Sequence, residues 1–63
     1  MYTEIKQDSV VVRQGECAPE MLVIQVAQGM AVCVWTDASG IPQAAMLVCD
    51  SLDVIAADYF ADR

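Results

Sequence analysis

The chain has 63 residues, of which 57% are hydrophobic and 19% charged, and its formal net charge is −6. This composition excludes a disordered chain, and the length allows one small domain with a marginal core, because only about 60% of the unfolded surface is buried at this size. The charge disfavours nucleic acid and anionic lipid as partners, since Lys6, Arg13 and Arg63 are too few and too scattered to pair with phosphates.

The chain is expected to fold into four strands separated by short turns. Three consecutive valines follow Ser9, and β-branched side chains fit a pleated sheet better than a helix. Three longer apolar runs come after these valines. We expect strands near 9–14, 20–28, 30–37 and 41–49.

Glycine and proline separate these strands. Gly15 and Pro19 lie in a loop after the first strand, and Gln28-Gly29 sits where a tight hairpin turn is expected. Gly29 adopts the positive φ of such a turn at little cost. Gly40 suits the left-handed position of a second hairpin loop, and Pro42, which lacks an N–H, belongs at the beginning of the fourth strand or on an edge.

The spacing of apolar residues changes in the C-terminal segment that begins at Leu52. Its apolar residues recur at helical spacing, at Leu52, Ile55, Ala56, Tyr59 and Phe60. Asp50 or Ser51 is a suitable N-cap for a helix that begins there. We therefore expect a helical turn near 51–60, packed on the strands.

Short strands with tight turns in so few residues predict an all-β domain covering 1–63, a small antiparallel barrel of four to five strands with a short C-terminal helix. The chain leaves no room for the crossover helices of a parallel sheet.

A valine-rich first strand, a Gly/Pro loop, a Met-x-Val start to the second strand and Cys-x-Trp in the third resemble the YodC-like family of small bacterial proteins of uncharacterised function. The resemblance implies an SH3-like β-barrel with no established catalytic residues. The matching residues are Asp8, Val10, Val12, Gly15, Pro19, Met21, Val23, Cys33, Trp35 and Leu52.

The two central strands are apolar on both faces, although a wall with water outside should alternate apolar and polar residues. The resemblance favours Met21, Val23, Cys33 and Trp35 as the inward set. The remaining set is a candidate self-association surface, formed by Leu22, Ile24, Val26, Val32 and Val34. The alternatives are that the C-terminal helix covers this set, or that a different protein does.

Trp35 is interpreted first as a core residue, because large aromatic side chains anchor barrel cores. The alternative is a groove for a protein partner, formed by Trp35 beside the loop that contains Gly15 and Pro19. Peptide grooves of this kind are lined by aromatic side chains, and the chain has few of them.

The residues that usually carry catalysis or bind metals are missing. Histidine is absent, and Cys17, Cys33 and Cys49 lie too far apart for the spacing of a structural zinc site. No glycine-rich phosphate loop is present. We expect no cofactor, no metal and no catalytic residue.

The compartment is inferred from the same cysteines and from the first residues. An odd number of cysteines without a secretory signal is typical of reduced thiols, and Met1–Asp8 is polar. The uncharged run 21–35 is shorter than the roughly 20 residues of a spanning helix. We expect a cytoplasmic protein outside the membrane.

The leading hypothesis is a non-enzymatic interaction module that forms a homo-oligomer and docks another protein. The alternative is a small-ligand binder or enzyme whose site forms only at an oligomer interface. The first rests on the two-faced apolar strands, and the second on the ability of small barrels to pool side chains from several copies.

Overall fold

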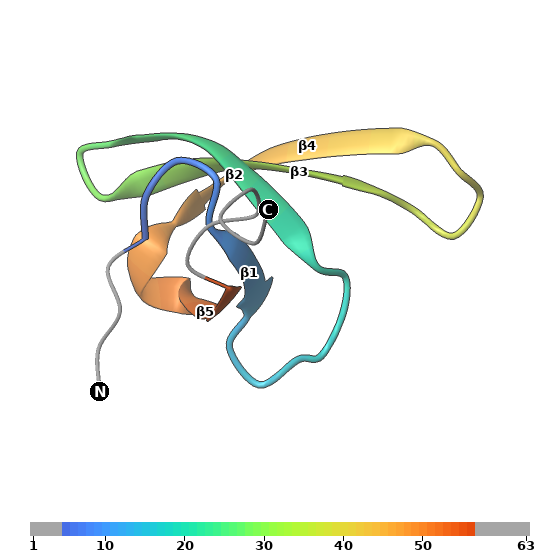
Figure 1. Cartoon of the computed structure of the whole chain (residues 1–63), viewed down its shortest axis with the longest axis horizontal. Coiled ribbons are helices and arrows are strands. Elements are labelled where there is room, and N and C mark those ends of the chain that lie inside the picture. Colours follow the sequence, from blue (N-terminus) through green and yellow to red (C-terminus); the bar gives the residue numbers. More distant parts are fainter. Residues whose placement is uncertain (1–4, 57–63) are drawn as a thin grey trace.

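The computed structural model describes residues 5–56, which form an all-β domain (Figure 1). Five strands make one antiparallel sheet, and a single turn of 3-10 helix, η1, is the only helical element in this part of the chain. The elements are β1 (Val10–Arg13), β2 (Met21–Ala27), β3 (Met30–Thr36), β4 (Pro42–Val48), η1 (Cys49–Ser51) and β5 (Leu52–Ala56). The first four strands lie within one residue of the ranges expected from the sequence.

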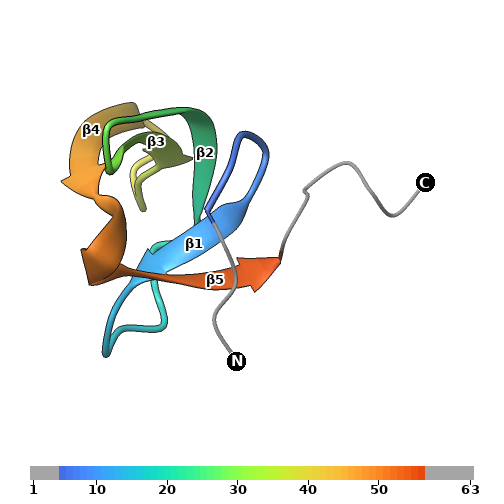
Figure 2. The same ribbon diagram turned by 90° about the vertical axis from the view of Figure 1, so that its left-hand side faces the viewer.

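The strand order across the sheet is β4-β3-β2-β1-β5. Each pair of neighbours is antiparallel, and β3 pairs along its whole length with β4. Within residues 5–56 no ladder joins β4 to β5, so the described sheet is open there rather than closed into a barrel. The sheet is nevertheless strongly curled, and β1 and β5 run beneath β2, β3 and β4 (Figure 2).

A two-residue turn joins β2 to β3, as the sequence predicts. Gln28 and Gly29 have φ values of 55° and 77°. A type I′ hairpin turn requires a positive φ at both central positions, and its twist matches that of the flanking strands. Gly29 adopts this conformation freely, whereas Gln28 pays a modest steric cost for it.

Asp37 organises the longer turn between β3 and β4. Its carboxylate accepts hydrogen bonds from the backbone N–H of Ser39 and of Ile41, both at 2.9 Å, and from the side-chain amide of Gln43 at 3.0 Å. The backbone N–H of Asp37 also donates to the carbonyl oxygen of Ile41 at 3.0 Å, and Gly40 has a φ of 83°. These bonds to the charged form hold the pKa of Asp37 below its ordinary value of 3.8.

The helical turn expected near 51–60 is wrong over residues 52–56, which form β5. Leu52 is buried and Val54 packs on the core, whereas Asp53 and Ile55 are exposed. Leu52 and Val54 therefore follow the two-residue period of a strand, and Ile55, which the helical period requires on the buried side, faces solvent. Pairing with β1 decides between the two periods, because local propensity yields to tertiary contacts. Residues 57–60 of the expected helix lie outside the described part of the chain.

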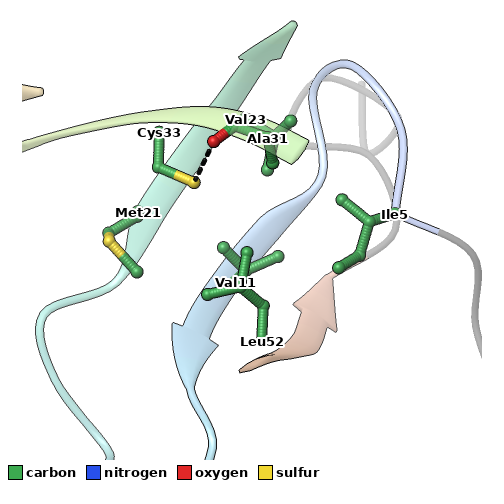
Figure 3. Packing of buried hydrophobic residues seen from close by; sticks show 7 residues of the cluster. All are labelled: Ile5, Val11, Met21, Val23, Ala31, Cys33 and Leu52. Carbon is green, nitrogen blue, oxygen red and sulfur yellow. Dashed lines mark hydrogen bonds between the residues drawn. The ribbon is translucent and has the colours of Figure 1, made fainter. Parts of the chain in front are cut away.

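The core lies on the inner side of the curled sheet (Figure 3). Its side chains come from β1, β2, β3, β5 and the segment before β1, and each is at most 7% exposed. They are Ile5, Val11, Met21, Val23, Ala31, Cys33 and Leu52. Trp35, Leu47 and Val54 pack against this cluster while partly exposed. The expected inward placement of Met21, Val23 and Cys33 is confirmed.

Truncation of a buried and of an exposed side chain of the same strand should lower the stability by different amounts. Met21→Ala removes a fully buried side chain and should cost about 2–5 kcal/mol of unfolding free energy. That loss is comparable with the whole stability of about 3–9 kcal/mol expected at this length. Ile24→Ala, at a position 45% exposed, should cost about 1 kcal/mol or less. Urea unfolding measures both; equal losses would contradict the assignment of the inner face.

The hydrogen bonds of Asp37 predict a pH-dependent contribution to stability. Because its pKa is lowered on folding, the stabilisation is fully present above the ordinary value of 3.8 and is lost as pH falls through the folded-state value. Asp37→Asn should therefore melt at a lower temperature than the parent chain at neutral pH. The difference should shrink below about pH 4. A difference that is constant from pH 7 to pH 2.5 would show that the carboxylate charge contributes nothing.

Candidate interaction surface

The outward side chains of β2, β3 and β4 form a continuous uncharged surface. The register places Leu22 beside Val34 and Val34 beside Ala44, and in the next row Gln25 lies beside Val32 and Val32 beside Met46. Side chains in such rows point to the same side of a sheet. We call this surface the outer face and define it by Leu22, Gln25, Ala27, Met30, Val32, Val34, Ala44, Met46 and Val48.

A bulge in β2 changes the set expected from strict alternation. The pairing with β3 shifts between Val23 and Gln25, so Ile24 has no partner across the ladder. Beyond the bulge Val26 pairs with Ala31 and packs against the core. The outward placement predicted for Val26 is therefore wrong, because the extra residue reverses the phase of the strand. Ile24 remains exposed beside the outer face.

Leu22, Val32 and Val34, the other three candidate self-association residues, do lie on the outer face. Each is half-buried by its neighbours in the sheet. The most exposed large side chains of the face come from β4, where Met46 is 64% and Val48 49% exposed. Sequence analysis missed β4 as a contributor, although alternate residues of the run 42–48 carry the signal. The face is therefore one strand wider than expected.

The outer face is hollowed in two places. The larger hollow has a volume of about 580 Å³, and Val10, Leu22, Val34 and Ala44 are among the residues that line it. Trp35, Gln43 and Glu20 also border it. The smaller hollow, of about 240 Å³, lies over the other end of the face and is lined by Gln25, Ala27, Gln28, Met30, Val32 and Met46. Both hollows are mainly apolar.

The outer face contains no charged residue. Between Met21 and Val48 the chain has a single charged residue, Asp37, and it lies in the turn at the far end of the β3–β4 hairpin. Glu20 at the start of β2 borders the larger hollow. The other charged residues of the described part lie before β2 or after β4. A surface of this kind fits an apolar contact.

The C-terminal residues in the described part do not cover the outer face. Leu52 belongs to the core, and β5 lies at the edge of the sheet beside β1, on the far side from β4. The alternative in which Leu52, Ile55 and Ala56 shield the face as a helix is therefore wrong. Tyr59 and Phe60, which the same alternative invoked, lie outside the described residues.

The partner groove expected at Trp35, Gly15 and Pro19 is only partly assembled. Trp35 borders the larger hollow, but Gly15 and Pro19 are not among its lining residues. Trp35 is half-buried, and the guanidinium carbon of Arg13 lies 5.9 Å from its ring centroid. Such a cation–π contact is worth about 0.5–1 kcal/mol near the surface. Trp35 thus bridges the core and the end of the hollow.

The cysteines differ in their surroundings. Cys17 is exposed, Cys49 is half-buried, and Cys33 is fully buried with its thiol 3.8 Å from the carbonyl oxygen of Ala31. Burial raises the pKa of Cys33, the nearby Cys49 thiol raises it further, and Arg13 acts in the opposite direction. Over residues 5–56 no cluster of three or more cysteine and acidic side chains is arranged to hold a metal ion.

Comparisons with known proteins identified no relative of this chain. No family model, curated protein or solved structure matches this chain. The resemblance to the YodC-like family therefore stays a prediction, and no activity is transferred from another protein. None of the helices in the described part has the length and apolar character needed to cross a bilayer.

The burial of the thiols predicts an order of reactivity. Cys17 should react with iodoacetamide at the rate of a free thiol, because it is exposed. Cys33 should react only when the protein opens, and an opening free energy of about 3 kcal/mol slows it more than about 100-fold. Mass spectrometry of alkylated peptides measures the rates separately. Similar rates for both thiols in native buffer would contradict the packing of β3.

Proposed function

We propose that this chain is a non-enzymatic interaction module that self-associates through its outer face. The observation that carries the proposal is a sheet surface spanning three strands, uncharged and mainly apolar, that no residue among 5–56 covers. A contiguous apolar patch on a soluble protein marks a binding surface or an aggregation liability. Burial against a second copy removes that liability.

The charge distribution favours a second copy over an unlike partner. With a net charge of −6, two copies repel each other wherever their acidic side chains approach. The outer face is the part of the described surface where this repulsion is weakest, because none of its residues is charged and the charges nearest to it in sequence, Glu20, Asp37 and Asp50, lie beyond the ends of its strands. A basic partner would find no acidic side chains within the face to recognise.

The finer architecture that we propose is an SH3-like barrel left open at one seam. Five short antiparallel strands curl around a single core, and the turn η1 connects the two edge strands β4 and β5 directly. Membership of the YodC-like family is part of the same proposal. It rests on the Met21-x-Val23 and Cys33-x-Trp35 pairs, whose members point inward or pack against the core.

A second candidate function is a small-ligand site completed by the partner copy. The larger hollow supports it, because about 580 Å³ is within the usual range of ligand pockets and Trp35, Gln43 and Glu20 offer polar groups at its border. The hollow is open on one side, so a second copy would be needed to enclose a ligand. A thermal-shift screen of metabolites without any hit would count against this function.

The outer face predicts that self-association weakens when hydroxyl groups replace its methyl groups. The double variant Val32→Thr/Val34→Thr preserves shape and strand propensity but buries two hydroxyls from each copy at the contact. If this costs about 2 kcal/mol or more, the dissociation constant rises roughly 30-fold or more. Sedimentation equilibrium of the parent chain and the variant at micromolar concentration measures the change.

Ile55→Thr is the matched control, because Ile55 is 51% exposed on β5 and lies off the outer face. It should leave the dissociation constant within about twofold, since exposed substitutions change free energies by about 0.5 kcal/mol. A parent chain that is monomeric at all concentrations tested would refute the proposed function. An equal effect of both variants would place the contact elsewhere.

A further inference from the structure

Strand β4 has an unpaired edge that the outer face does not explain. Within residues 5–56 only β3 pairs with β4, so the other side of β4 has no strand partner. Of the backbone groups on that side, the carbonyl oxygen of Val48 accepts one hydrogen bond, from the Ser51 hydroxyl at 2.7 Å, and keeps its second lone pair for another donor. Natural proteins guard such edges with charged side chains, proline or bulges, because an open edge is a template for another strand. The sequence of β4, PQAAMLV, has no charge, and its proline is the first residue. The edge is long and unguarded.

Two backbone hydrogen bonds show which groups of β4 face outward. The N–H of Asp37 donates to the carbonyl oxygen of Ile41 at 3.0 Å, and the N–H of Cys49 donates to the carbonyl oxygen of Gly29 at 2.8 Å. Hydrogen-bonded pairs alternate with non-bonded pairs along an antiparallel ladder, and the register of β3 and β4 is unbroken. The N–H groups that point away from β3 therefore belong to Ala44, Met46 and Val48.

We propose that a second copy of this chain pairs with that edge, β4 against β4 and antiparallel, with Met46 on the twofold axis. In this register Ala44 faces Val48 of the second copy, and Met46 faces its own equivalent. All the outward N–H groups of both strands then find carbonyl partners. A register displaced toward the start of β4 brings in Pro42, which has no N–H. One displaced toward its end runs into η1.

The side chains are self-complementary in the same register. Across the axis the small Ala44 lies opposite the larger Val48, and on the inner side Ala45 lies opposite Leu47. Such cross-strand pairs of apolar side chains stabilise a sheet, whereas like charges directly opposite destabilise it. Since β4 carries no charge, the repulsion between two chains of net charge −6 is not concentrated at this contact.

This edge contact deepens the proposed function and rests on the same self-association, but it is made by the backbone edge of β4, whereas the outer face contributes side chains. The outer face packs sheet on sheet, whereas the β4 edge extends one sheet into the next. Each contact is isologous and alone gives a twofold dimer. Where their twofold axes are perpendicular and intersect, the two contacts together generate a tetramer with dihedral symmetry, the next most common closed assembly after the dimer.

Disulfide trapping tests the register. In a Cys17→Ser background, Met46→Cys places two thiols across the axis, where a Cα–Cα separation of about 5.5 Å lies within the range of a disulfide. Ala44→Cys is the matched control, because in this register residue 44 faces residue 48 and not itself. We expect Met46→Cys to form a covalent dimer under mild oxidation, and Ala44→Cys to form at least about tenfold less.

Removal of an outward N–H tests the edge without a cysteine. Ala44→Pro eliminates one donor on each strand and spares the ladder to β3, since proline is tolerated on an edge strand whose N–H faces outward. Ala44→Val has a similar volume and retains the N–H. We expect the edge contact to be roughly tenfold weaker or more in the proline variant and unchanged in the valine variant. Native mass spectrometry and sedimentation measure assembly size.

The outcomes separate the two proposals. A tetramer that Ala44→Pro reduces to a dimer, together with selective trapping through Met46→Cys, supports the edge contact. An assembly that resists Ala44→Pro while Val32→Thr/Val34→Thr dissociates it overturns the edge contact and leaves the proposed function standing. Preferential trapping through Ala44→Cys overturns the register. A chain that stays monomeric overturns both proposals.

Discussion

The structure depends on one constraint. A sheet has two faces, and a chain of this length has enough residues to cover only one of them. The curl that brings β1 and β5 beneath the central strands buries Met21, Val23 and Cys33 completely. Nothing in the described part returns over Leu22, Val32 and Val34. The inner face forms the core of the domain, and the outer face is left uncovered by residues 5–56.

Some elements of the sheet are determined by local sequence, and others by tertiary contacts. The positions of the strands and of the tight turn at Gln28-Gly29 follow from β-branched runs and turn residues, and the sequence predicts them closely. The helix expected at the C-terminal end is wrong, because Leu52 fits a helical stripe with Ile55 and Ala56 and also fits a strand face with Val54, and only the pairing with β1 selects the strand. Periodicity alone contains no information about that partner.

The sequence predicts that the central strands have an uncovered apolar face, and the structure changes the set of residues that form it. Two apolar faces on the central strands imply an unpaired face, and Leu22, Val32 and Val34 occupy it. Val26 does not, because a bulge at Ile24 is a property of the register with β3 and leaves no clear mark in the sequence of β2. The contribution of Met46 and Val48 required the pairing of β4 with β3. Which side chains share a face depends on the register between neighbouring strands. The sequence of one strand taken alone does not specify that register.

The central claim is that a second copy covers the outer face, and methyl NMR with a soluble paramagnetic probe tests it most directly. The methyl groups of Leu22, Val32 and Val34 should be accessible to the probe in dilute solution and become protected as concentration rises. The methyl groups of Ile55, off the face, should remain accessible throughout. Equal accessibility of all four residues at every concentration would contradict the account.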